Sequence, residues 1–84
     1  MKISSNNLFN KIESLKKSFT DSEKKILKYI KKNSEEVTSM SIKELSGKTD
    51  TGEATIIRFC KKIGFKGYND FKISLIRSIS KEKQ

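Results

Sequence analysis

The side chains that usually perform catalysis or bind metal ions are scarce in this chain. Its 84 residues include no histidine and a single cysteine, Cys60. Since imidazole is the commonest general base and a frequent metal ligand, this composition excludes histidine-based triads and zinc sites built from His and Cys. The carboxylates are scattered among lysines, and there is no glycine-rich phosphate loop and no constellation of paired acids. We therefore expect no catalytic residues, no metal site and no cofactor, and an enzyme is the least favoured class of protein.

The single cysteine has a structural explanation. Cys60 lies on the apolar side of a predicted helix, where it would act as a small buried hydrophobic residue. A reactive thiol is the alternative that we favour less. One cysteine also excludes an internal disulfide.

The side chains that could bind a ligand are basic. Lys and Arg number 19 against 10 Asp and Glu, which gives a formal net charge of +9. Such an excess favours a polyanionic partner, either nucleic acid or a membrane surface. No apolar run reaches the length of a membrane span, and no signal-peptide pattern opens the chain. We therefore expect a cytoplasmic protein that binds nucleic acid and not a membrane.

Helical periodicity accounts for nearly the whole chain, and the absence of proline suits an all-α domain. Capping boxes at Thr20 with Glu23 and at Ser41 with Glu44 mark the starts of two helices. We expect a compact all-α bundle of about five helices. They cover residues 7–17, 20–33, 41–47, 52–63 and 68–80, with a short extra turn near residue 37. The lysines of the second helix, at positions 24, 28 and 31, are interpreted as a solvated face.

The stretch 41–64, SIKELSGKTDTGEATIIRFCKKIG, reads as two short helices joined by a turn at residues 48–51. In the second helix, one buried stripe is formed at i, i+3, i+4 and i+7 by Ile56, Phe59, Cys60 and Ile63. The basic residues lie toward its other side, and Gly64 is expected to end it. This pattern is typical of a helix-turn-helix, which places its second helix in the DNA major groove.

We expect the second helix and its flanks to contact DNA. The expected contact residues are Thr51, Gly52, Glu53, Ala54, Thr55, Arg58, Lys61, Lys62 and Lys66. Arg58 is the candidate base reader, because Arg pairs bidentately with guanine, and a phosphate contact or a surface salt bridge is its alternative. Glu53 could accept from cytosine N4, or it could only compensate the helix dipole. The three lysines are expected to contact phosphates, although two of them also suit a helix C-terminus.

A non-DNA role is the alternative reading, either an RNA-binding domain or a protein-interaction module. Readers of single-stranded RNA usually display stacking aromatic side chains. Here Phe59, Phe65, Tyr68 and Phe71 fall on predicted core faces. This placement argues against RNA reading.

Residues 51–75, TGEATIIRFCKKIGFKGYNDFKISL, closely resemble the signature of the RpiR-type bacterial transcriptional regulators. Residues 40–46, MSIKELS, and residues 20–37, TDSEKKILKYIKKNSEEV, resemble the helices that precede that signature in the family. The resemblance implies a DNA-binding domain that normally precedes a sugar-isomerase-like domain sensing a phosphosugar. Regulators of this kind control genes of sugar uptake and catabolism, usually as dimers or tetramers.

The same resemblance sets the expected domains and partners. Residues 1–79 are expected to form the helix-turn-helix domain, and residues 80–84 a polar tail leading toward a second domain absent from this chain. The expected partners are double-stranded DNA and a second copy of the chain in a homodimer. A phosphosugar effector is expected to bind only through the missing domain.

The turn departs from the family pattern. Where the family usually has Gly-Val-Ser, this chain has Asp50, Thr51 and Gly52. Asp tolerates a left-handed backbone, but less well than Gly. Gly52 has no side chain to cap the next helix, so Asp50 or Thr51 is expected to do so, and the spacing of Asp50 and Glu53 fits a capping box.

Two groups of apolar residues exceed what one core seam needs. They are Ile73 and Ile76 in the last helix, and the stripe of Leu8, Ile12 and Leu15 in the first. We expect weak self-association through one of these surfaces. A broad core-facing stripe is the alternative.

Overall fold

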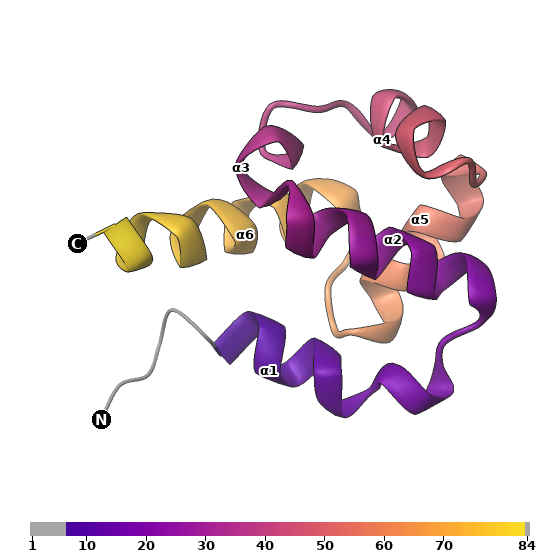
Figure 1. Cartoon of the computed structure of the whole chain (residues 1–84), viewed down its shortest axis with the longest axis horizontal. Coiled ribbons are helices and arrows are strands. Elements are labelled where there is room, and N and C mark those ends of the chain that lie inside the picture. Colours follow the sequence, from indigo (N-terminus) through magenta and orange to yellow (C-terminus); the bar gives the residue numbers. More distant parts are fainter. Residues whose placement is uncertain (1–6, 84) are drawn as a thin grey trace.

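The computed structural model describes the backbone of residues 7–83 and the side chains of residues 8–80. Six α-helices and one 3-10 turn occur within this part of the chain (Figure 1). They are α1 (Asn7–Ser14), η2 (Lys16–Ser18), α2 (Asp21–Lys32), α3 (Ser34–Val37), α4 (Ile42–Thr49), α5 (Glu53–Lys62) and α6 (Tyr68–Lys83). The described residues contain no strand, so the predicted all-α class is confirmed.

Both predicted capping boxes are present and set where α2 and α4 begin. The Thr20 N–H donates to Glu23 Oε1 at 2.9 Å, and Thr20 Oγ1 accepts from the Glu23 N–H at 3.2 Å. The corresponding distances for Ser41 and Glu44 are 2.9 and 3.1 Å. Each box satisfies two N–H groups that have no partner within the helix, and an N-cap of this kind is worth about 1 kcal/mol.

The first helix is shorter than predicted. The α-helix ends at Ser14, and residues 16–18 continue as the 3-10 turn η2. The Ser18 N–H donates to the carbonyl of Leu15 at 2.9 Å, and the Phe19 N–H donates to that of Lys16 at 3.1 Å. Bonding three residues back tightens the chain into a 3-10 turn. At the other end of the chain, α6 continues to Lys83, beyond the predicted end at residue 80.

The core gathers around Phe59 of α5. Its ring lies 5.3 Å from that of Phe19 and 6.2 Å from that of Phe71, which belongs to α6. Figure 1 shows α2 crossing in front of α5, with α1 below it and α6 extending to the left. Leu8 and Ile12 are buried, at 6% and 0% exposed, so the stripe on α1 belongs largely to this core. The prediction that it serves self-association is therefore wrong.

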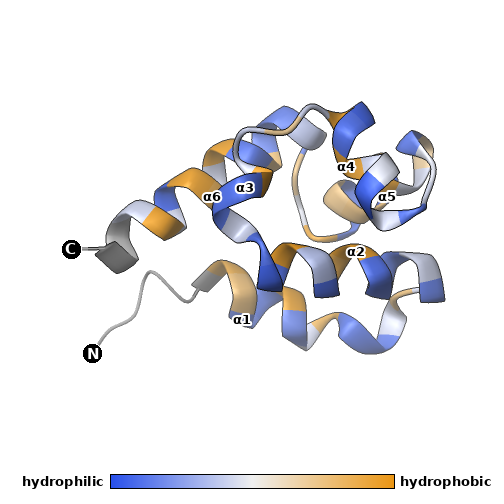
Figure 2. Cartoon of the chain, turned by 45° about the horizontal axis from the view of Figure 1, so that its top comes forward, coloured by the Kyte–Doolittle hydropathy of each residue, from blue (hydrophilic) through white to orange (hydrophobic). Residues whose placement is uncertain are grey.

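The apolar surplus of α6 remains at the surface. Ile73 is 52% exposed and Ile76 is 44% exposed. In Figure 2, hydrophobic segments continue along the part of α6 that projects away from the other helices. Only the α6 half of the predicted apolar surplus is therefore exposed.

The turn between α4 and α5 needs one left-handed residue, which is Asp50, with φ 56° and ψ 44°. The Thr51 N–H donates to the carbonyl of Ser46 at 3.1 Å, the bond that closes a Schellman motif. The N-cap of α5 is Gly52, and no side chain caps it. The predicted capping box of Asp50 and Glu53 is therefore wrong, because α5 starts two residues later than that box requires and Asp50 closes α4 instead.

The end of α5 follows the prediction. Gly64 has φ 100°, in the left-handed region that favours glycine. Its N–H donates to the carbonyl of Lys61, and the Phe65 N–H donates to that of Cys60, both at 3.0 Å. This Schellman motif directs the chain from α5 into the loop before α6.

Candidate nucleic-acid interface

The two faces of α5 separate as the sequence predicts. Its apolar stripe is fully buried, with Ile56, Phe59, Cys60 and Ile63 each 0% exposed. The outward face is exposed and consists of Glu53, Ala54, Ile57, Arg58 and Lys61. Helix α5 packs on both α2 and α4, so the core fixes which face is turned outward. This arrangement presents one helix face for contact with a flat or grooved partner.

The guanidinium of Arg58 lies along this outward face. Arg58 Nη2 donates to Thr55 Oγ1 one turn earlier, at 3.4 Å. Thr55 is half-buried, and Arg58 is exposed. Since the guanidinium has five N–H donors, this long bond leaves the others available to a base or a phosphate. The guanidinium of Arg58 therefore lies beside Thr55 on the exposed side of α5.

Lys62 has its ammonium turned toward the start of α2. Its Nζ donates to Glu23 Oε1 at 2.7 Å and to the Ser18 carbonyl at 2.8 Å. It also lies 5.7 Å from the centre of the Phe19 ring. Lys62 thus fastens the end of α5 to the N-terminus of α2. The sequence did not indicate this role, because the partners lie 39 and 44 residues away. A phosphate contact by Lys62 stays a prediction.

The carboxylate of Glu23 serves both α2 and Lys62. It is 2% exposed, and burial raises its pKa. The hydrogen bonds from Lys62 and from the Thr20 N–H outweigh burial, so the pKa of Glu23 lies below its ordinary value. Glu23 therefore remains a carboxylate at neutral pH and holds a charged pair.

A groove of about 580 Å³ runs beside α5. Its lining includes Ser41 at the start of α4, Ile57 and Lys61 on α5, Lys66 in the following loop, and Lys72 on α6. Three ammonium groups and the N-terminus of α4 therefore border one hollow. In a helix-turn-helix the first helix crosses the DNA backbone, and a helix N-terminus favours anions.

The sequence did not single out Lys72. Its Nζ donates to the carbonyl of Met40 at 3.0 Å and lies 5.4 Å from the centre of the Tyr68 ring. The Tyr68 hydroxyl donates to the same carbonyl at 2.8 Å. Burial raises the pKa of Tyr68 to about 12, so this hydroxyl remains a donor. Both side chains tie α6 to Met40, two residues before α4, a contact across 28 to 32 residues that no local pattern reveals.

The structure places the predicted contact residues in three settings. Gly52, Glu53, Ala54, Arg58, Lys61 and Lys66 are exposed at or near the outward face, Thr51 and Thr55 are half-buried, and Lys62 is paired with Glu23. The contacts themselves stay predictions. Thr51 contributes its hydroxyl to a 2.8 Å hydrogen bond with Thr49 inside the turn.

No alternative chemistry emerges from the described residues. Among them, no three His, Cys, Asp or Glu side chains gather to hold a metal ion. Burial raises the pKa of the Cys60 thiol to about 12, which fits the predicted structural role. Within the part of the chain that the structure describes, no helix is long and apolar enough to cross a membrane.

A family model described as a helix-turn-helix domain of the rpiR family matches residues 6–82. The chain belongs to the rpiR family of helix-turn-helix domains. The resemblance seen in the sequence is thereby confirmed, and α4 and α5 are the two helices of the motif. A helix-turn-helix is a motif that places its second helix in the DNA major groove.

Relatives of this rpiR-family domain are longer proteins. It is 48% identical over 71 residues to an uncharacterised helix-turn-helix-type transcriptional regulator of Caldanaerobacter subterraneus. The aligned region covers 84% of this chain and 25% of that protein. It is 44% identical over 81 residues to an uncharacterised helix-turn-helix-type transcriptional regulator of Haemophilus influenzae. The aligned region covers 95% of this chain and 28% of that protein. The chain therefore spans about a quarter of the length of these relatives.

A solved structure has the same fold. The NanR protein of Vibrio vulnificus, complexed with ManNAc-6P, superposes with a TM-score of 0.86 at 33% sequence identity. The match covers 90% of this chain and 29% of the NanR chain. The fold that this chain shares with NanR thus extends over most of its length.

Proposed function

We propose that this domain binds double-stranded DNA in a sequence-specific manner, with α5 in the major groove. The observation that carries the proposal is the outward face of α5, which bears Glu53, Ala54 and Arg58 and is covered by no other element of the described chain. A B-form major groove admits one α-helix. We therefore propose a binding module and not an enzyme.

The residues around α5 divide into readers and anchors. Arg58 is the proposed base reader, because its fork matches O6 and N7 of guanine. Lys61, Lys66 and Lys72 border the groove beside α5, and their ammonium groups suit phosphates, which position the protein without specifying sequence. The N-terminus of α4 adds a favourable dipole at the same place. Lys72 is thus added to the residues that the sequence suggested.

A role in sugar or phosphosugar metabolism is a further part of the proposal. NanR is a structural relative complexed with ManNAc-6P, a sugar phosphate. Since this chain spans about a quarter of its relatives, we propose that a second domain beyond residues 80–84 binds such an effector. We also propose a homodimer that reads two half-sites about one DNA turn apart. With DNA as its partner, we expect the chain to act in the cytoplasm.

Selection of bound fragments from random duplexes tests the proposal and supplies the specific site. Affinity for that site should fall with salt, with a slope of log K against log salt of about −4 to −5 if four to six phosphates are neutralised. Arg58→Ala should weaken the selected site by about 5- to 150-fold and random DNA much less.

Lys66→Ala is the matched control, because a lost phosphate contact weakens both DNAs by a similar factor. Equal losses for Arg58→Ala on both DNAs would make Arg58 a phosphate contact. A salt-independent affinity, or a selection that enriches no sequence, would contradict the proposed function.

A further inference from the structure

Much of the positive charge lies on α2 and not on α5. Helix α2 exposes five lysines, which are Lys24, Lys25, Lys28, Lys31 and Lys32. Lys16 of η2 and Lys48 of α4 lie beside them. We call these seven residues the α2 lysine face. The sequence suggested only a solvated surface here, because it did not show that η2 and α4 add their lysines to those of α2.

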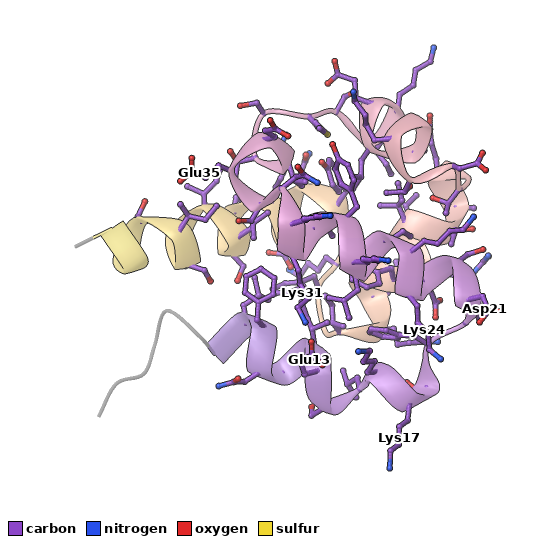
Figure 3. All side chains as sticks on the ribbon, in the orientation of Figure 1. Glu13, Lys17, Asp21, Lys24, Lys31 and Glu35 are labelled. Atoms are coloured by element: carbon purple, nitrogen blue, oxygen red, sulfur yellow. The ribbon has the colours of Figure 1, made fainter. Side chains whose placement is uncertain are left out.

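The α2 lysine face is hollowed. A groove of about 540 Å³ is lined by Leu27 and by the lysines at positions 16, 24, 28, 31 and 32. A second groove of about 280 Å³ shares Lys28 and Lys32 with the first and reaches Lys48 on α4. Figure 3 shows Lys31 reaching toward Glu13 on α1, and these two side chains form an ion pair. Glu13 also lies 3.9 Å from Lys16, so its single negative charge is shared by two lysines of the face, and the other five lysines are not paired with it.

The α2 lysine face points away from the proposed major-groove helix. Helix α2 buries Ile26, Leu27 and Ile30, and it packs directly on α5. With 3.6 residues per turn, Lys25, Lys28 and Lys32 fall on the opposite side of α2 from these buried residues, whereas Lys24 and Lys31 lie at its edge, on the side of Leu27. Figure 1 accordingly shows α2 in front of α5. The body of α2 thus separates Lys25, Lys28 and Lys32 from α5.

The side chains of the α2 lysine face suit phosphates better than a protein surface. Protein interfaces are depleted in Lys and are built around apolar, aromatic and Arg anchors. Here the charged groups that line the two grooves are lysines, with Glu13 as a flanking acid, and the apolar side chain in the larger groove, Leu27, is only 2% exposed. The exposed large hydrophobic residues of the described chain, Ile57, Ile73 and Ile76, lie on α5 and α6.

The spacing of the lysines also fits a nucleic-acid backbone. From Lys24 to Lys31 the helix rises by about 10 Å, which equals about three phosphate steps of 3.4 Å along the axis of one strand of B-DNA. Lysine is a mobile point charge that neutralises phosphate without reading bases. We propose that the α2 lysine face is a second, sequence-independent binding surface for duplex DNA, so that one chain holds two duplex segments. This inference rests on the proposed function of α5.

A bridging assay tests the inference. The selected duplex is immobilised and saturated with protein, and a fluorescent random duplex is then added. The unmodified chain should capture the second duplex, and the amount captured should fall steeply with salt. Lys24→Glu/Lys28→Glu should reduce capture at least tenfold while changing affinity for the immobilised site less than about threefold. Lys17→Glu/Arg77→Glu changes the net charge equally and should preserve capture, because neither residue lines the grooves.

Three results would overturn the inference. Capture that persists in Lys24→Glu/Lys28→Glu would show that the second duplex is held by α5 of another copy. Loss of capture in Lys17→Glu/Arg77→Glu would reduce the effect to net charge. Displacement of the duplex by poly-glutamate at equal charge concentration would indicate an acidic protein as the partner.

Failure of the proposed function remains distinguishable from failure of this inference. In Arg58→Ala, binding to random duplex in solution should persist, and adding Lys24→Glu/Lys28→Glu should weaken it without abolishing it, because Lys61, Lys66 and Lys72 remain beside α5. Specific binding that is intact without any capture contradicts only the second surface. Capture without a specific site contradicts only the role of α5.

Discussion

Replacing Lys62 by methionine should destabilise the domain far more than the same change at Lys61. Lys62 makes two charge-assisted hydrogen bonds, at 2.7 and 2.8 Å, and its partner Glu23 has a side chain only 3% exposed. Methionine keeps much of the apolar stem but removes the ammonium. The change therefore leaves a nearly buried carboxylate whose remaining charge-stabilising bonds come from Thr20.

The magnitude follows from the exposure of the two partners. Removing one member of a buried ion pair costs about 3–5 kcal/mol. The Lys62 side chain is 32% exposed, so water reaches the site in the variant and reduces that penalty. We expect a loss of about 2–3 kcal/mol, which is a drop in Tm of about 10–20 °C for a domain of this size. Lys61→Met should cost less than about 0.5 kcal/mol, as for other surface positions.

Urea unfolding followed by circular dichroism at pH 7 measures both variants. Adding Glu23→Gln to Lys62→Met should recover part of the loss, because no buried charge is then left unpaired. If Lys62→Met costs no more than Lys61→Met, the pair is not a stabilising contact. A normal stability together with a salt slope reduced by about 0.9 would instead make Lys62 a phosphate contact.

Three further predictions concern the turn, pH and self-association. Asp50→Gly should stabilise the domain by about 0.5–1 kcal/mol, because glycine removes the strain of the left-handed backbone at this position. Thermal melts measure the change, and an unchanged Tm would mean that this backbone is already relaxed. Adding Thr51→Val should gain little more, since the hydroxyl of Thr51 donates to Thr49, whose own hydroxyl donates to Leu45. The pKa of Glu23 lies below its ordinary value of 4.5, so its charged form stabilises the fold above that pH and this contribution is lost as the pH falls through the lowered value. Acid titration of stability should therefore be shallower in Glu23→Gln, and an identical acid limb would exclude Glu23 as a contributor. Sedimentation should show dimers with a Kd of about micromolar order, which is a free energy of association of about −8 kcal/mol. Ile73→Lys/Ile76→Lys should abolish these dimers, because both side chains are exposed on α6. A strict monomer would leave that α6 surface unpaired in this chain.

Local sequence signals predicted the helices and some of their ends, although α1 ends earlier and α6 later than predicted. The boxes of Thr20 and Ser41 and the left-handed Gly64 depend on residues three to five positions apart, so their patterns can be seen in the sequence. The buried stripe of α5, which includes Cys60, could be predicted for the same reason, because its residues are three or four positions apart in the sequence. The failed capping box at Asp50 shows the limit of such signals. Two motifs compete for one residue there, and the position where α4 ends decides which of them forms.

Contacts between helices could not be predicted in this way. Lys62 reads as a phosphate ligand in the sequence, yet in the fold it pairs with Glu23, 39 residues away. Lys72 reaches Met40 across 32 residues, and the lysines of α2 join those of η2 and α4 in shared grooves. The sequence by itself determined the helices, the family and the total charge of +9. Only the tertiary structure decided which charges are paired and which are displayed together, because side chains far apart in the chain meet only after the helices have packed.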